Sequence, residues 1–171
     1  LAATAGASYG VYAGYELFEN VARPGSEENI DNEKYEYKVR DWAAAEHNGE
    51  SLAPFLRTLN HIRASHPALR QLRGLTIHRS NDEGILVFSK HIPAALTSDG
   101  VSDTIIVVVN VDPHSVRETT LELDTTVWDI PRGQSYLAHD LLSNQEWTWT
   151  DRVYVRLDAF SEPAHIVHVR G

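Results

Sequence analysis

The side chains best suited to chemistry lie in a long polar stretch between Glu16 and Glu50. Within it, residues 33–38 alternate charged and aromatic side chains, and Arg40-Asp41-Trp42 places a base and an acid that could form an ion pair beside an indole. Ammonium and phenol groups hydrogen-bond sugar hydroxyls, and aromatic rings pack on sugar faces. The stretch therefore suits a sugar or phosphate pocket, although a surface cluster of ion pairs would have the same composition.

The element expected to position this stretch is Ser8–Glu16, which leads directly into it. Small residues at positions 10, 13 and 14 leave room for neighbouring backbone, and three tyrosines supply bulk with high β-propensity. We expect a short buried strand that ends in the Glu16 carboxylate, after a helix end over residues 1–7 that Gly6 stops. A helix, a turn, a buried strand and a long polar loop are typical of a β/α barrel, whose active site lies on the loops after the strands.

One clear helix follows the polar stretch. Ser51 is a natural N-cap, Pro54 is tolerated in a first turn, and His66-Pro67 predicts where the helix ends. Apolar residues recur at helical spacing along it, namely Leu52, Phe55, Leu56, Leu59 and Ile62. This stripe must pack on another surface, and in a barrel it would belong to the helix after the Ser8–Glu16 strand.

From Leu75 onward the pattern changes to short strands separated by turns. The predicted strands are 75–78, 85–88, 104–111, 116–123, 135–137, 147–150, 153–157 and 165–169. Residues 81–84 predict a hairpin turn, residues 92–103 predict a loop, and the β-branched run 104–111 predicts a central strand. These features predict an antiparallel β-sandwich, with a domain boundary near Arg73 or Gly74.

Composition narrows the classes of protein to which the chain can belong. It has 171 residues, whereas a complete β/α barrel needs about 250, and it begins with Leu1, so we expect a fragment or a processed product. The net charge of −9 argues against nucleic-acid and anionic-membrane partners, and the apolar run 105–109 is too short to span a bilayer. The absence of cysteine excludes disulfides and permits a cytoplasmic location, which we expect.

Histidines and tryptophans provide weaker signals. The sequence has 9 histidines but no His-Glu-x-x-His motif, and His165 and His168 should point to opposite faces of one strand. We therefore expect structural or surface histidines, with no metal site and no cofactor. Trp147 and Trp149 should share one face of a strand, where core packing is favoured over an exposed platform for sugars.

Taken together, these residues resemble the α-amylase superfamily of glycoside hydrolases and glycosyltransferases, glycoside hydrolase family 13. Residues 9–16 are similar to the eighth barrel strand of that superfamily, residues 52–69 to its eighth barrel helix, and the strand-rich tail to its C-terminal sandwich. The loop with residues 25–28, 33–35 and 40–42 resembles the superfamily's maltosyltransferases. Those enzymes move maltosyl units from α-maltose 1-phosphate to the non-reducing end of an α-1,4-glucan.

The resemblance implies where the chemistry lies. The superfamily retains anomeric configuration through an aspartate nucleophile and a glutamate acid/base, helped by a third carboxylate, all on earlier barrel strands. Glu16 and Glu19 match none of those motifs, so no catalytic residue is expected in this chain. By resemblance, Lys34 and Tyr35 contact the maltosyl hydroxyls of the donor, with Lys34 as a binding group and not as an acid or base.

These observations predict an α+β fragment. Residues 1–73 would be the C-terminal end of a catalytic (β/α)8 barrel, with its last strand, last helix and donor-site loop, and residues 74–171 an all-β antiparallel sandwich. The chain alone would be inactive. Its partners would be maltose 1-phosphate, α-1,4-glucan, the missing N-terminal part and, by resemblance, a second subunit of a homodimer. Two alternatives stay open: a trehalose-forming isomerase or glucan hydrolase of the superfamily, and a glucan-binding or structural sandwich without catalysis.

Overall fold

The computed structural model describes residues 1–30 and 37–170 and divides the chain into two compact units. The sandwich unit comprises Leu1–Ser8 and Ile62–Gly171, and the loop unit comprises Tyr9–His61. The division falls inside helix α3 (Ala53–Ser65). None of the helices in the described part of the chain combines the length and apolar character that a membrane span requires.

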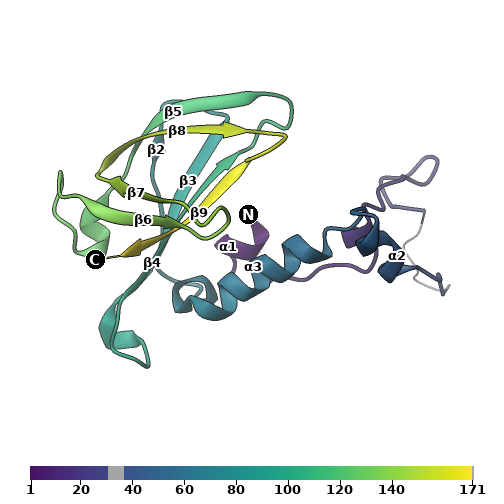
Figure 1. The fold of residues 1–171 in the computed structure, drawn as a ribbon, viewed down its shortest axis with the longest axis horizontal. Coiled ribbons are helices and arrows are strands. Elements are labelled where there is room, and N and C mark those ends of the chain that lie inside the picture. The colour runs from purple at the N-terminus through teal and green to yellow at the C-terminus, as the bar shows by residue number, and fades with distance from the viewer. Residues whose placement is uncertain (31–36, 171) are drawn as a thin grey trace. The chain divides into compact units, whose positions relative to one another are not determined.

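The sandwich unit is built on antiparallel sheets (Figure 1). In the described residues, one sheet has six strands in the order β1-β3-β4-β9-β6-β7, and the other has three in the order β2-β5-β8. Figure 1 shows β5 and β8 running over one face of the larger sheet. The strands are β1 (Leu75–Ile77), β2 (Arg79–Ser80), β3 (Ile85–Ile92), β4 (Asp103–Asn110), β5 (Val116–Glu122), β6 (Tyr136–Asp140), β7 (Glu146–Trp149), β8 (Arg152–Asp158) and β9 (Ala164–Arg170).

The core lies between the two sheets and follows from hydrophobic alternation. Along β8, exposed and buried residues alternate, which turns Val153, Val155 and Leu157 inward. β4 lies between β3 and β9 and is buried along almost its whole length, so the predicted central strand is confirmed. Both sheets contribute to the core: Ile85, Val87, Ile106, Val108, Leu121, Leu123, Trp128, Tyr136, Ala138, Trp149, Val153, Val155, Leu157 and Val167. The predicted antiparallel sandwich is therefore confirmed.

The start of the sandwich differs in detail from the prediction. The strand predicted over residues 75–78 is split at His78, because β1 pairs with β3 in the larger sheet while β2 pairs with β5 in the smaller one. The predicted turn at 81–84 does reverse the chain between β2 and β3, and the Asp82 carboxylate accepts the Gly84 N–H at 2.7 Å. β3 then continues to Ile92 and pairs with β4 along its whole length.

Short helices attach the first residues of the chain to the sandwich unit. α1 (Ala2–Ala5) ends at Gly6, as predicted. The Arg63 guanidinium donates hydrogen bonds to the carbonyl oxygens of Ala3, of Gly6 at 3.1 Å and of Ala7 at 2.8 Å. A 3-10 helix, η2 (Pro67–Arg70), packs against β3 and β4. Backbone carbonyls at the end of α1 thus provide acceptors for the partly buried positive charge of Arg63.

The loop unit differs from the predicted barrel end at Ser8–Glu16. That segment is irregular up to the 3-10 helix η1 (Tyr15–Leu17), and Val11 and Tyr12 are exposed. The hydrogen bonds around η1 are local, as from the Tyr15 N–H to the Tyr12 carbonyl at 3.1 Å. A strand needs a neighbouring strand to satisfy its backbone groups, and none of the described strands pairs with this segment.

Helix α3 matches its predicted bounds closely. The Ser51 hydroxyl accepts the Ala53 N–H at 3.1 Å, and the helix ends at Ser65, before His66-Pro67. Of the predicted apolar stripe, Ile62 is buried, but Phe55 is 49% exposed and the other members are half-buried. Much of the apolar face of the helix is therefore uncovered in the described residues. The loop unit also contains helix α2 (Trp42–His47).

Candidate functional site

Lys34 and Tyr35, the predicted donor-binding residues, lie outside the described residues. The chain on either side of them is described. Before them, a bridge between Ala22 and Asn29 closes a small hairpin, and after them Tyr37 is 91% exposed. The structure therefore shows how the two segments that flank this candidate site are held.

Glu19 joins the two flanks of the candidate site. Its carboxylate accepts hydrogen bonds from Arg40 Nε and Nη2, both at 2.8 Å, and from Lys38 Nζ at 3.0 Å. The Arg40 side chain is only 4% exposed and the Glu19 side chain 16% exposed. The hydrogen bonds from Arg40 hold the pKa of Glu19 at about 2, against the opposing effect of its partial burial, with a smaller contribution from Lys38.

The geometry around Glu19 requires a glycine at position 14. Gly14 has φ +100°, and a Cβ added to it would lie 2.1 Å from Glu19 Oε2. The Gly14 N–H is itself bonded to Glu16 Oε2 at 3.2 Å, while the Glu16 carbonyl accepts the Leu52 N–H at 2.7 Å. Both glutamates thus help to hold the backbone next to the candidate site in place. An ionised Glu19 that is paired through both carboxylate oxygens has no proton to donate at neutral pH.

The sequence suggested an ion pair between the neighbours Arg40 and Asp41 in Arg40-Asp41-Trp42. The structure arranges these residues differently. Arg40 pairs with Glu19, not with its neighbour Asp41. The Asp41 carboxylate instead accepts the Ala44 N–H at 2.9 Å and caps α2. The Arg40 guanidinium lies 5.8 Å from the centroid of the Trp42 ring, within the range of a cation–π contact. No local sequence pattern indicated the partner of Arg40, because Glu19 is distant along the chain.

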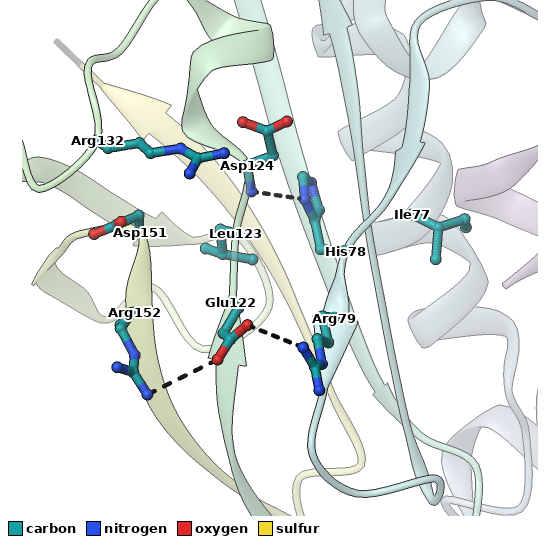
Figure 2. A pocket seen from close by; sticks show the side chains of 9 residues that line it. All are labelled: Ile77, His78, Arg79, Glu122, Leu123, Asp124, Arg132, Asp151 and Arg152. Atoms are coloured by element: carbon teal, nitrogen blue, oxygen red, sulfur yellow. Dashed lines mark hydrogen bonds and ion pairs between the residues drawn. The ribbon is translucent and has the colours of Figure 1, made fainter.

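A polar pocket of about 390 Å³ opens at the smaller sheet of the sandwich unit (Figure 2). Glu122 lies between two arginines there, 3.8 Å from Arg79 and 3.9 Å from Arg152. Both arginines are more than two-thirds exposed, so these pairs contribute little to stability. Arg132 extends toward Asp124 on the other side of the pocket. The lining is balanced in charge and lacks an aromatic platform, so it does not resemble a sugar-stacking site.

His78 forms the buried end of this pocket and is 9% exposed. Its Nδ1 accepts the Asp124 backbone N–H at 3.1 Å, so in the neutral ring the proton resides on Nε2. That nitrogen lies 2.8 Å from Ser89 Oγ, which also accepts from Trp128 Nε1 at 3.0 Å. Burial lowers the pKa of His78 to about 4, partly offset by the Asp124 carboxylate. The neutral imidazole is a structural link and has no free nitrogen for a ligand.

Trp147 and Trp149 lie on one face of β7, as predicted. Their rings are stacked, with centroids 5.7 Å apart and 12° between planes. Trp149 is 7% exposed and belongs to the core, while Trp147 is half-buried and meets the His165 ring edge-on. Core packing is therefore confirmed for Trp149, and a ring that is buried in this way is not available to stack on a sugar.

The histidines of β9 point to opposite sheet faces, as predicted. His165 contacts Asp140, and His168 Nε2 lies 3.5 Å from Asp103 Oδ1. His66, which follows α3, reaches the same Asp103 oxygen at 2.9 Å. Sequence reasoning missed both carboxylates, because each is separated from its histidine by a long stretch of chain. Among the described residues, His66, Asp103 and His168 bring metal-ligand atoms together, as do Asp140, Glu162 and His165.

Comparison with known proteins gives a consistent set of relatives. Residues 77–169 match the family model described as "GLGE, C-terminal". Over 99% of its length the chain is 45% identical to the α-1,4-glucan:maltose-1-phosphate maltosyltransferase of Arcanobacterium haemolyticum, of which it covers 25%. It is 44% identical to the enzyme of the same name from Bifidobacterium longum, covering 22% of it, and 41% identical to that of Mycolicibacterium smegmatis, covering 24%. The chain thus spans about a quarter of the length of these relatives.

Proposed function

The chain belongs to the family described as "GLGE, C-terminal", and on this basis we propose that it is the C-terminal part of a maltosyltransferase. The whole enzyme would move maltosyl units from α-maltose 1-phosphate to the non-reducing ends of an α-1,4-glucan and release phosphate. The observation that carries the proposal is the alignment of 99% of the chain, including the loop around Lys34 and Tyr35, with enzymes of that name.

In this proposal, residues 1–73 are the end of a catalytic (β/α)8 barrel and residues 74–171 are the sandwich domain that follows it. Several apolar side chains of the loop unit support the assignment of this part of the chain to a barrel. Tyr12, Tyr15, Phe18 and Phe55 are each about half or more exposed. Apolar surface of this extent usually marks a region that packs against further protein. Other barrel strands of the same polypeptide would cover it and would pair with Ser8–Glu16. The enzyme is further proposed to be a cytoplasmic homodimer.

Lys34 and Tyr35 are proposed to bind the maltosyl hydroxyls of the donor. The nucleophile and the acid/base would lie on barrel strands outside this chain. The ion pairs of Glu19 with Lys38 and Arg40 support this assignment, because they tie together the two flanks of the segment that carries Lys34 and Tyr35. A binding group gains affinity and precision when the backbone around it is fixed before the ligand arrives.

The test uses the full-length enzyme, with phosphate release from α-maltose 1-phosphate measured in the presence of glycogen. We expect Tyr35→Phe, which removes one hydrogen bond, to lower kcat/KM for the donor up to about tenfold. Lys34→Gln removes a charged donor and should lower it by about 10- to 100-fold. Tyr37→Phe is the matched control, because Tyr37 is 91% exposed, and it should leave the kinetics unchanged.

Two outcomes would overturn the proposal. If the full-length protein converts maltose to trehalose or hydrolyses starch, and releases no phosphate from maltose 1-phosphate, it is a different member of the superfamily. If phosphate is released but Lys34→Gln and Tyr35→Phe match Tyr37→Phe in kcat/KM, the donor-site assignment is wrong while the reaction assignment stands.

A further inference from the structure

Three side chains from separate elements of the sandwich unit converge on one point. His66 lies between α3 and η2, Asp103 begins β4, and His168 belongs to β9. His66 Nδ1 lies 2.9 Å and His168 Nε2 lies 3.5 Å from the same oxygen, Asp103 Oδ1. All three ligand atoms lie within 4.8 Å of one another. With metal–nitrogen distances of about 2.0–2.1 Å, neighbouring ligands of a tetrahedral zinc ion lie about 3.3 Å apart, so these separations need only small adjustments.

The carboxylate at the centre of this cluster is already held in place. Asp103 is 6% exposed, and its second oxygen accepts the Ala68 backbone N–H at 2.9 Å. A hydrogen bond of this kind, to the oxygen that faces away from an ion, orients the ligand in known metal sites. The two imidazole rings are also in contact, with centroids 4.6 Å apart.

We propose that His66, Asp103 and His168 bind one divalent transition-metal ion of the zinc type. Two imidazole nitrogens and one carboxylate oxygen are a ligand set that suits Zn²⁺ or Co²⁺ better than Mg²⁺ or Ca²⁺. Water would complete the coordination, because the His168 side chain is 25% exposed and leaves a path from solvent.

The second cluster of potential metal ligands, Asp140, Glu162 and His165, is less suited to bind an ion than the first. Asp140 is fully buried and its oxygens already accept hydrogen bonds from Ser143 Oγ at 2.7 Å and from the Ile166 N–H at 3.0 Å, among others. A metal ion there would have to displace partners that the fold requires. At Asp103 the ion would replace only the contacts with the two histidines themselves.

The proposed ion would have a structural role. It would join the segment after α3 to β4 and β9 within the sandwich unit, and it takes no part in the transfer reaction. The inference does not depend on the proposed function, because metal binding is measured without substrate.

The test is a titration of the metal-free chain with Co²⁺, followed by visible absorption. We expect one equivalent to produce the intense d–d bands of a four- or five-coordinate site, and Zn²⁺ to abolish them. His168→Gln and His66→Gln should each weaken Co²⁺ binding at least tenfold. His114→Gln, which changes an exposed histidine on a turn, is the matched control and should bind like the unmodified chain. Circular dichroism of each metal-free variant checks that it is folded.

A second measurement on the unmodified chain does not rely on any variant. In long-range ¹H–¹⁵N spectra of the nine histidine rings, Zn²⁺ should shift the signals of His66 and His168 selectively. The proposal fails if no Co²⁺ d–d bands appear, if His114→Gln weakens binding as much as His168→Gln, or if Zn²⁺ leaves the rings of His66 and His168 unshifted. Any of these results leaves the maltosyltransferase assignment untouched.

Discussion

His78 links the two sheets of the sandwich through a neutral imidazole. One ring nitrogen accepts the backbone N–H of Asp124, which follows β5, and the other contacts Ser89 of β3. The Trp128 ring lies edge-on to the imidazole, with centroids 5.4 Å apart. Protonation of Nδ1 would break its hydrogen bond with the Asp124 N–H and place a charge in a buried site. The folded protein therefore disfavours protonation of His78.

This resistance predicts a pH dependence of stability. The folded pKa of His78 is about 4 and the ordinary pKa of a histidine is 6.5, so between these values the unfolded chain binds a proton that the folded chain does not. The contribution of the neutral ring is therefore fully present above pH 6.5 and is lost as the pH falls toward 4. The full shift corresponds to about 3 kcal/mol.

Urea unfolding of the unmodified chain and of His78→Gln between pH 4 and 7 measures this contribution. The stability difference in favour of the unmodified chain should be largest at pH 7 and should shrink by up to about 3 kcal/mol toward pH 4. His114→Gln controls for the removal of a histidine at an exposed turn. A difference between the unmodified chain and His78→Gln that stays constant across this range would show that His78 titrates alike in the folded and unfolded states.

At the scale of elements, the entry of the chain into β1 depends on one glycine. Gly74 has φ +74°, and a Cβ added to it would lie 2.1 Å from the carbonyl oxygen of His91. The approach is close because the His91 N–H donates to the Gly74 carbonyl at 2.9 Å, next to the β1–β3 pairing. A side chain at this position would have to push the two backbones apart.

We predict that Gly74→Ala is more destabilising than Gly100→Ala. Gly100 has nearly the same φ, +72°, but nothing lies within 4 Å of an added Cβ. Gly100→Ala should therefore cost only the left-handed backbone penalty, about 1–2 kcal/mol. Gly74→Ala adds the overlap with His91, for which about 1–3 kcal/mol more is expected. Thermal or urea unfolding compares the two variants. Equal losses would mean that the backbone at Gly74 relaxes without cost.

At the scale of the whole molecule, the two units differ in how completely they bury their apolar residues. The sandwich unit has a continuous core that both sheets contribute to, whereas the loop unit exposes apolar side chains such as Tyr12, Phe18 and Trp42. The chain spans about a quarter of the length of its relatives, and this agrees with the incomplete burial of apolar residues in the loop unit. The sandwich unit closes its own core, whereas the proposed donor site on the loop unit would need further polypeptide to cover its apolar side chains.

We therefore predict that the 171-residue chain alone releases no phosphate from α-maltose 1-phosphate with glycogen as acceptor. The full-length enzyme, assayed in parallel at the same molar concentration, should release it. Turnover by the isolated chain would show that the catalytic carboxylates lie within these residues, and it would contradict the proposed division of the enzyme.

The sequence alone determined the β-rich half of this protein closely. Local patterns of alternation, capping and proline geometry among neighbouring residues predict its strands, the end of α3 before His66-Pro67 and the turn at 81–84. The folded structure was needed to show that Arg40 pairs with Glu19, that a predicted strand is divided at His78 between two sheets, and that Asp103 lies close to two distant histidines. Such pairings depend on which segments the fold brings together, and no local pattern encodes them. Ser8–Glu16 shows the same limit, because a strand exists only where another strand is present to bond with it.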